Sequence, residues 1–477
     1  MTAPALKPLP DSPDNLLSGA RFRAYPSWPL GQTLAQWIGS QRVVFNAKTT
    51  EDRYFASLRR LELATSAEPV STPLDRAYSQ FKSRELTPWL FDVPSQVLRN
   101  GSDRWYDAKQ RQLKGLAKAP TIRNRSNFNS VVITSELFRF RDIQNAMGAP
   151  ERVLELGTVA NPVGILPFKA HRPFGIPKTI VIRRTSVDEW YVSFCYASAA
   201  PEGFVARTAE ELAYELKTLD AEALAACALG VDRNVKTNAV ATSDGRFFYI
   251  NREQQERLKR KEIGRKRLQR RAARKAKGSA NRRRAYRRVA KSYRYGANVR
   301  QDFSHQTSHS LVTEATGDGA APLLIAFEDL KIPSMVRRPK AKQDASGKWV
   351  SNRRAQKAGL NKAILSSCWG AIASQVQYKA ARRNILFLKV PAAYSSQECS
   401  RCGHTHPDNR HEQSFACQRC SLVLHADTNA GRVTKKRGIA QVRAQEVKTK
   451  AKKSVNFRKR KPSNPGAERP AVPVENL

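Results

Sequence analysis

The chain has 477 residues, of which 84 are Lys or Arg and 41 are Asp or Glu, giving a formal net charge of +43 at pH 7. This length is too great for one average domain, and a 40% share of hydrophobic residues suffices for more than one core. The charge argues against an ordinary enzyme of small metabolites and predicts a polyanionic partner, with nucleic acid favoured over a membrane surface. No apolar run approaches the roughly 18 residues that span a bilayer, and the N-terminus lacks a signal-peptide core. We therefore expect a cytoplasmic protein without membrane contact.

The N-terminal part of the chain mixes strand and helix patterns. Residues 1–20 contain four prolines and are predicted to be a disordered tail. Strand patterns predict a β-barrel formed by 21–48 and 119–200, and the broken helical pattern of 49–118 predicts a helical lobe inserted into it. The Ala- and Glu-rich segment 201–228 is a predicted helical connector. One helical face is expected to be buried: Leu30, Leu34, Trp37, Ile38 and Val44.

A second domain of α/β type is predicted over 229–396. It is interrupted by a helical insertion, 252–316, whose first 49 residues (252–300) hold 21 Lys and Arg against three Glu. Sparse apolar positions there predict two long basic helices joined near Gly278. Around the insertion, strands are predicted at 229–232, 238–242, 246–250, 323–327 and 385–390, with one helix at 360–376.

Four of the seven cysteines form two C-x-x-C pairs, Cys399 with Cys402 and Cys417 with Cys420. Four thiolates at this spacing suit tetrahedral Zn²⁺ with no open position, so we expect a structural zinc ribbon in a reducing compartment. The nearby histidines are predicted to be exposed loop residues, because four sulfurs already fill the coordination sphere: His404, His406, His411 and His425. The other cysteines are predicted core thiols: Cys195, Cys227 and Cys368.

Three acidic residues follow strands or begin a helix. Asp232 follows an apolar strand, Glu328 ends the strand 323–327, and Asp427 begins a helix directly after the cysteines. Singly, each is better explained by a solvated strand end or helix start, but the three together stand in the order of elements of an RNase H-like nuclease. Cleavage of a phosphodiester with Mg²⁺ or Mn²⁺ needs carboxylates that converge from adjacent strand ends. Asp329 should point away from Glu328, since side chains alternate along a strand.

Four blocks carry a family pattern: Gly230-Val231-Asp232, Ala326 to Leu330, Tyr394 to Gly403, and Asp427-Thr428-Asn429-Ala430. They resemble the split RuvC-type nuclease and zinc ribbon of the TnpB family, over residues 21–435. TnpB proteins are RNA-guided nucleases of bacterial insertion sequences, and compact type V CRISPR effectors descend from them. The resemblance implies a RuvC-like nuclease domain at 229–396, a zinc ribbon at 397–424 and a last nuclease motif at 425–440.

The resemblance also implies an activity and partners. It implies an RNA-guided, Mg²⁺-dependent DNA endonuclease of prokaryotes, associated with the nucleoid. A guide RNA would pair with target double-stranded DNA, and Asp232, Glu328 and Asp427 would hold the catalytic metal ions. No feature of the sequence predicts an oligomeric state.

The motifs depart from the family pattern in two places. Asn234 stands where the family usually has glycine, with Arg233 before it. Ala426 precedes the last acid where arginine is common, and Gly431 replaces a common alanine. Two alternatives stay open: a guided DNA-binding protein that does not cleave, and a transposase-associated protein that acts on element ends. The intact acids argue against the first, and the lack of a recombinase pattern of Tyr or Ser argues against the second.

Basic and aromatic segments complete the predictions. The insertion 252–300 is expected to be a groove wall for the phosphates of a guide–target duplex. The basic tail 441–477 is expected to be disordered, and the loop 333–358 is either a lid beside Glu328 or a surface linker. Several aromatic residues of the N-terminal part are expected in the core rather than stacked on bases: Trp28, Trp37, Trp89, Trp105 and Tyr106.

Overall fold

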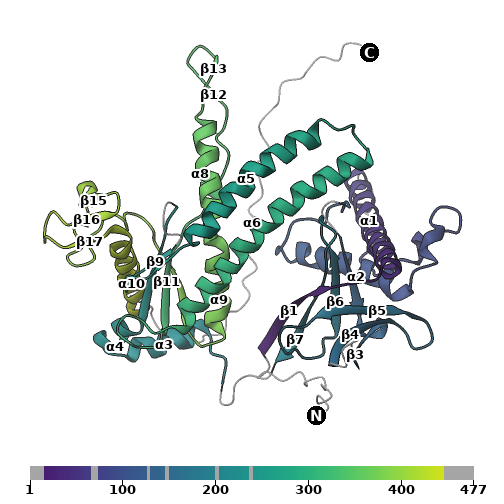
Figure 1. The fold of residues 1–477 in the computed structure, drawn as a ribbon, viewed down its shortest axis with the longest axis horizontal. Coiled ribbons are helices and arrows are strands. Elements are labelled where there is room, and N and C mark those ends of the chain that lie inside the picture. The colour runs from purple at the N-terminus through teal and green to yellow at the C-terminus, as the bar shows by residue number, and fades with distance from the viewer. Residues whose placement is uncertain are drawn as a thin grey trace.

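The computed structural model describes two β-sheet bodies joined by long helices (Figure 1). An antiparallel sheet lies on the right of the view and a mixed sheet on the left, and a pair of long helices runs between them. No helix within the described part of the chain is both long and apolar enough to cross a membrane. The described residues are 16–65, 73–125, 129–144, 150–198, 204–235 and 240–444.

The ordered elements of the chain extend into both predicted tails, 1–20 and 441–477. Residues 16–20 belong to strand β1 (Leu16–Ala24) rather than to a tail, because β7 (Trp190–Ser198) is long enough to pair with the whole of β1. At the other end, helix α10 (Ala426–Ala444) continues beyond residue 440. The rest of both predicted tails lies outside the described residues.

The N-terminal sheet has seven antiparallel strands in the order β2-β6-β7-β1-β5-β4-β3. The predicted strand at 21–26 is part of β1, and the predicted hairpin at 179–194 is present. The strands between 138 and 169 were missed by the sequence prediction. Among the described residues the pairings do not close the sheet into a barrel. Its remaining strands are β2 Ser130–Thr134, β3 Phe138–Gln144, β4 Pro150–Gly157, β5 Pro162–Lys169 and β6 Thr179–Arg184.

Helix α1 (Trp28–Ala64) begins at the N-cap Ser27 and is continuous through residue 48, where the barrel was predicted to give way to the helical lobe. All five apolar residues of its predicted buried face are buried. Gln41 joins the helix to its neighbours: its side-chain Nε2 donates to the carbonyl oxygens of Val97 and Val132, both at 3.0 Å. Helix α2 (Ser95–Leu113) packs on α1, and three short 3₁₀ segments lie nearby at Ser79–Phe81, Pro88–Leu90 and Ser135–Leu137.

The second sheet has five strands in the order β10-β9-β8-β11-β14. Strand β8 pairs antiparallel with β9 and parallel with β11, and β11 pairs parallel with β14. The strands predicted from sequence are present in the predicted order along the chain, and residues 238 and 239 of the second one lie outside the described residues. On one face of this sheet, the hydrophobic core includes residues of α6 (Ala280–Thr313) and α9 (Trp369–Ala381). On the other face, the core includes residues of α3 and α10. These elements are β8 Ala228–Arg233, β9 Val240–Thr242, β10 Phe247–Phe248, β11 Leu324–Glu328, β14 Leu386–Val390, α3 Ala209–Thr218 and α4 Ala221–Ala226.

The basic insertion is the helical hairpin that the sequence predicts. Helix α5 (Arg252–Ala273) and helix α6 (Ala280–Thr313) meet at Gly278, whose positive φ of 82° favours glycine. In Figure 1 the hairpin extends from the mixed sheet toward α1. Ion pairs of Arg287 with Asp188 (3.9 Å) and of Arg294 with Glu189 (3.4 Å) fix it to the turn between β6 and β7.

The segment after β11 differs from its prediction. The loop 333–358 contains a hairpin of β12 (Lys342–Gln343) and β13 (Trp349–Val350), which projects beyond α8 in Figure 1. The single helix predicted at 360–376 is two helices, α8 (Arg354–Ser366) and α9 (Trp369–Ala381). They separate at Cys368, which has left-handed φ and ψ of 60° and 18°. A short helix α7 (Ile332–Met335) precedes the hairpin.

Two predictions about single residues need correction. Cys195 is exposed rather than a core thiol, because it alternates along β7 with the buried Phe194. Cys227 is buried and Cys368 is half-buried. Among the aromatic residues Trp37 and Trp105 are in the core as expected, whereas Trp28 and Trp89 are exposed.

Candidate functional site

The three predicted acids lie close together where strands β8 and β11 of the mixed sheet end. Asp232 lies near the end of β8, Glu328 is the last residue of β11, and Asp427 is in the first turn of α10. In the parallel pair, Phe327 lies opposite Val231, which places Glu328 beside Asp232. All three side chains are buried, with no more than 6% of each residue exposed. The site is therefore assembled from elements nearly 200 residues apart in the sequence.

Burial and mutual repulsion dominate the electrostatics of this cluster. Desolvation, followed by the charges of Glu328 and Asp427, raises the pKa of Asp232 from 3.8 to about 8. A carboxyl group in this position holds a proton at neutral pH until a cation replaces it. Burial and the neighbouring acids therefore favour the neutral form of Asp232 when no cation is bound.

This pKa predicts an unusual pH dependence of stability. Between pH 3.8 and about 8 the folded chain keeps a proton on Asp232 that the unfolded chain has lost, so stability without bound cations should fall as the pH rises. Asp232→Asn cannot ionise and should raise the melting temperature by several degrees at pH 8, with little effect near pH 4. Thermal unfolding over this pH range, without added divalent metal, tests the prediction. Parallel pH curves for both proteins would contradict it, and Asp329→Asn serves as an exposed control.

Each acid has one polar partner that holds it in place. The Asn234 side-chain amide donates to Asp232 Oδ2 at 2.8 Å, and the Ser395 hydroxyl donates to Glu328 Oε1 at 2.5 Å. Arg410 Nη2 lies 3.1 Å from Asp427 Oδ1. Ser395 stands inside a motif block and Asn234 lies two residues after one, but Arg410 has no sequence signal beyond its place between the two cysteine pairs.

The departure from the family pattern after the first acid has a structural explanation. Arg233 is buried, donates from Nη2 to the backbone carbonyl of Glu328, and lies 5.5 Å from the ring of Phe327. Desolvation lowers its pKa, while the charges of Glu328 and Asp232 act in the opposite direction. The carbonyl of Asn234 accepts from Trp369 Nε1 at 3.1 Å. Both unusual residues therefore support the acid cluster rather than disrupt it.

Asp329 does not belong to the cluster. Its side chain is about a third exposed and pairs with Lys331 at 2.5 Å. The predicted divergence of Glu328 and Asp329 is confirmed, and Asp329 is a natural control for experiments on the acids.

Glycines bring α10 close enough to the sheet to place Asp427. A Cβ atom on Gly230 would lie 2.0 Å from the carbonyl oxygen of Gly431, and a Cβ on Gly431 would lie 2.9 Å from Ser243 N. A Cβ on Gly438 would lie 2.6 Å from the Cβ of Ala326. Gly431, the residue that replaces a common alanine, is therefore required by this close packing.

The four cysteines form the predicted cluster. Their sulfur atoms all lie within 4.8 Å of one another, with 3.6 Å between Cys399 and Cys420 and 3.6 Å between Cys402 and Cys417. Sulfur ligands at about 2.3 Å from a tetrahedral metal ion stand about 3.8 Å apart, so the geometry fits such an ion. Burial opposes ionisation of Cys417, but the backbone N–H groups of Cys420 and Arg419 outweigh it and lower the pKa of its thiol to about 6. In the same cluster without a metal ion, the neighbouring sulfurs raise the pKa of Cys420 to about 12, so it is the geometry of the four sulfur atoms that supports metal binding.

The cysteine module also holds the start of α10. It carries the strands β15 (Arg410–His411), β16 (Ser414–Ala416) and β17 (Val423–His425), after the 3₁₀ turn Pro407–Asn409. The side chain of Asn429 on α10 donates to the carbonyl of Glu398 at 2.8 Å and accepts from the N–H of Ser400 at 3.0 Å. These contacts tie the position of Asp427 to the folding of the module.

His425 is not the exposed loop residue that the sequence predicts. Its Nδ1 accepts from the backbone N–H of Asp427 at 3.2 Å, and its ring packs edge-on against Phe247 at 4.7 Å. It ends β17 immediately before α10, where its ring acceptor satisfies one of the N–H groups that begin the helix.

The sequence matches known protein families over both parts of this site. Residues 211–336 match the family model described as "Probable transposase" (OrfB_IS605), and residues 369–434 match "Cas12f1-like, TNB domain". Two curated relatives are named "Putative RNA-guided DNA endonuclease". InsQ of Escherichia coli (strain K12) is 29% identical over 74% of this chain and 77% of its own length. The Streptomyces pristinaespiralis protein is 25% identical over 88% of this chain and 89% of its own.

The chain is therefore similar to transposases of the OrfB type and to relatives named as RNA-guided DNA endonucleases. A shorter match is to the "CRISPR-associated endodeoxyribonuclease Cas12f1" of Sulfoacidibacillus thermotolerans, 35% identical over 16% of the chain and 18% of that protein. Among solved structures, the Cas12f1–sgRNA–target DNA complex has a TM-score of 0.41 at 11% identity, covering 88% of this chain and 99% of that one. The mini-RNA-guided endonuclease CRISPR-Cas_phi3 has a TM-score of 0.42 at 10% identity, covering 93% of each chain.

Proposed function

We propose that this chain is an RNA-guided DNA endonuclease that cuts guide-matched double-stranded DNA with Asp232, Glu328 and Asp427. Two relatives that it matches over most of their length carry the name of that activity. The single observation that carries the assignment of the site is the burial of three carboxyl groups together; this burial, followed by the charges of Glu328 and Asp427, raises the pKa of Asp232 to about 8.

The proposed domain is an RNase H-like nuclease of the RuvC type. Its support is the strand order β10-β9-β8-β11-β14, with antiparallel pairs on one side of β8 and parallel pairs on the other. Asp232 and Glu328 lie at the ends of adjacent parallel strands, where catalytic groups commonly gather, and Asp427 joins them from α10. The proposed division keeps the domains expected from sequence: an N-terminal β domain with a helical lobe, the nuclease with its basic insertion, and the zinc ribbon.

Divalent metal ions fit the acid cluster. Among the described residues the four cysteines are the one group of potential ligands within 4.8 Å of one another, so the three carboxylates are spaced more widely than a single ion requires. Carboxylate oxygens are the ligands that Mg²⁺ and Mn²⁺ prefer, and phosphodiester cleavage commonly uses a pair of such ions. When bound, such ions would polarise the phosphodiester and supply a nucleophile at neutral pH. Asp232, Glu328 and Asp427 would hold them, with Asn234 and Ser395 orienting two of the carboxylates.

The proposed ion of the cysteine cluster is Zn²⁺, with a structural role. All four positions of a tetrahedral site would be filled by sulfur, which leaves none for water or substrate. The proposed nucleic-acid partners, guide RNA and target DNA, suit the excess of 18 positive charges within 252–300. The hairpin of α5 and α6 spans the space between the two sheets, as a groove wall for a guide–target duplex would.

Arg410 is proposed to position Asp427 and to balance the charge of the acids. Arg410→Gln is expected to reduce cleavage by roughly 100-fold, the scale seen when one charge-stabilising donor is lost. RNA affinity should not change, and Arg410→Lys should restore part of the rate. Single-turnover cleavage at saturating Mg²⁺ measures this effect. A wild-type rate in Arg410→Gln would contradict the proposed role.

The function is tested by expressing the gene with its native flanking DNA and sequencing the RNA that copurifies with the protein. One dominant RNA with a constant part and a short variable end is expected. A mixture of unrelated cellular RNA would contradict guided recognition. Strand transfer of element ends without RNA would instead support the transposase alternative.

A further inference from the structure

A basic pocket lies away from the acid cluster, between the mixed sheet, α10 and the cysteine module. Its volume is about 580 Å³, and it contains none of the three acids. This volume is in the range of sites for small ligands, so it accepts a nucleotide rather than a duplex. The walls are the start of β8, the turn between β9 and β10, the loop before β11 and the middle of α10. Its basic side chains are Arg401, Arg432, Lys435 and Lys436.

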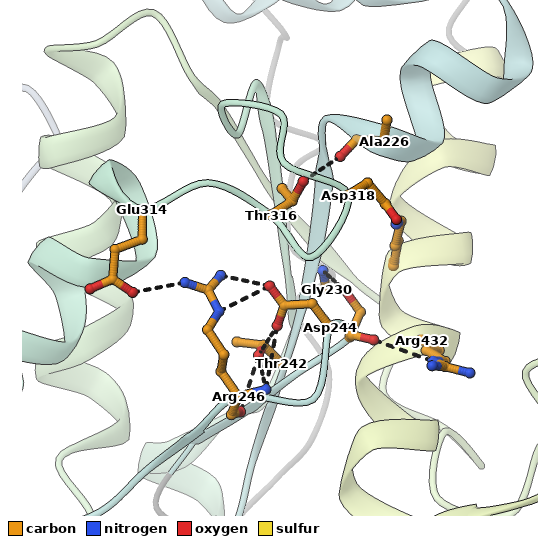
Figure 2. Close-up of polar contacts among 11 residues, drawn as sticks. Ala226, Gly230, Thr242, Asp244, Arg246, Glu314, Thr316, Asp318 and Arg432 are labelled. Carbon is orange, nitrogen blue, oxygen red and sulfur yellow. Dashed lines mark hydrogen bonds and ion pairs between the residues drawn. The ribbon is translucent and has the colours of Figure 1, made fainter.

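The acidic side chains of this pocket already have partners. Figure 2 shows Arg246 facing Asp244, with Arg246 Nη2 2.8 Å from Asp244 Oδ2. Burial opposes ionisation of Asp244, but Arg246 outweighs it and lowers the pKa of this carboxyl, so its charge persists and is met by Arg246. Asp318 is paired with Lys435 on α10, at 3.7 Å.

Three positive charges remain at the pocket. Arg432 donates from Nε to the backbone carbonyl of Ser243 at 3.3 Å, as Figure 2 shows, and Lys436 donates to the carbonyl of Arg401 at 3.3 Å. Carbonyl oxygens orient these groups without neutralising them. Within the described parts of the chain, none of Arg401, Arg432 and Lys436 forms an ion pair with a carboxylate. The pocket therefore has a surplus of positive charge for an anion.

The walls are fixed in place. Ser243 accepts through Oγ from the N–H of Gly230 at 3.1 Å, and Thr316 donates through Oγ1 to the carbonyl of Ala226 at 2.7 Å (Figure 2). A Cβ on Gly317 would come within 2.8 Å of the Asp244 Cβ, so loop and turn are in close contact. Apolar side chains complete the lining beside the charges: Ala225, Ala228, Leu229, Leu422 and Ile439. A rigid pocket with apolar walls and unpaired cations is suited to a base and its phosphates.

We propose that this pocket binds one nucleotide unit of a single-stranded part of the guide RNA, with its phosphates on Arg432, Lys436 and Arg401. The proposal rests on the proposed function for the presence of that RNA. Arg432 and Lys436 follow Asp427 by five and nine residues on α10, so at 1.5 Å per residue they lie about 8 and 14 Å along the helix from the acid. The site is thus separate from the cutting centre, and its occupant need not be the strand that is cut.

The test compares full-length complexes that carry their copurified RNA. The double variant Arg432→Gln with Lys436→Gln is expected to bind the guide RNA about 10-fold more weakly at physiological salt, with a salt slope smaller by about 1.4. A nucleotide-resolution footprint should lose protection at one to three adjacent positions only. Asp318→Asn, which frees Lys435, should bind several-fold more tightly. Arg59→Gln with Arg60→Gln, an equal charge change on the exposed surface of α1, should leave that local footprint intact.

The outcomes separate this proposal from the proposed function. A guide RNA that copurifies with an unchanged footprint in the double variant overturns the pocket assignment and leaves guided cleavage standing. Two results in the double variant would overturn the choice of RNA as ligand. One is a loss of protection on single-stranded DNA but not on RNA. The other is a wild-type affinity for RNA combined with weaker binding of inorganic phosphate or a free nucleotide. If no guide RNA copurifies, the proposed function fails and this proposal fails with it.

Discussion

Asp232→Ala is expected to reduce DNA cleavage to about a thousandth of the wild-type rate or less, while the affinity for RNA stays unchanged. Asp232 interacts electrostatically with both other acids, since burial and the charges of Glu328 and Asp427 raise its pKa. Its removal would leave two carboxylates to hold ions that need three. Cleavage of a guide-matched plasmid, measured beside RNA affinity, tests this expectation.

Asp329→Ala is the matched control for this experiment. Asp329 is adjacent in sequence to an acid of the cluster, but its carboxylate is exposed and pairs with Lys331 at 2.5 Å. Its loss should leave cleavage near the wild-type rate. Retained cutting by Asp232→Ala would show that the acid cluster is not the cutting centre. Equal losses in both variants would mean that the effect is not specific to the cluster.

Loss of the cysteine cluster should also abolish cleavage, by a different route. Cys417→Ser removes the sulfur that receives N–H groups from Arg419 and Cys420, so the proposed Zn²⁺ should be lost and the module should unfold. Asp427 depends on this module through Arg410 and Asn429, and cleavage should therefore fall to background.

Metal content and cleavage are measured together for this variant. The wild-type chain should contain one zinc ion and Cys417→Ser none, with a lower melting temperature. Cys195→Ser, which alters an exposed thiol outside the cluster, should match the wild type in both respects. One zinc ion per chain and a normal rate in Cys417→Ser would contradict the proposed dependence.

Strong local patterns explain what the sequence could predict. A short apolar run that ends in an acidic residue is a strong strand pattern. The predicted bounds of β8 and β11 therefore agree with the structure to within a residue or two. The long basic helices were recognised from Gly278 between two helical patterns, and the cysteine cluster from spacing alone. The convergence of the three acids was expected from the order of elements along the chain, and the structure brings Glu328 and Asp427 near enough to raise the pKa of Asp232.

Other features depend on contacts between distant segments. Strand β3 alternates Phe138 and Phe140 with Arg139 and Arg141, but its pairing with β4 and β5 has no local signal of comparable strength. The break between α8 and α9 rests on the left-handed conformation of one residue, which interrupts an unbroken apolar pattern. Arg410 could not be identified, since only the folded module brings it to Asp427.

The structure explains two residues that differ from the family pattern. Gly431 is required because a Cβ there would meet the turn that follows β9. Arg233 supports the carbonyl of Glu328 from within the sheet. Departures from a family pattern are therefore weak arguments against activity when the altered side chains face the same site.

The most direct test of the central claim is to reprogram the RNA. Purified protein is loaded with either of two RNAs that differ only in the variable end, and each complex is given both matching plasmids with Mg²⁺. Our account predicts that each complex cuts only the plasmid that matches its own RNA, and that protein without RNA cuts neither. Cutting of the same plasmid whichever RNA is loaded, or cutting without RNA, would contradict it.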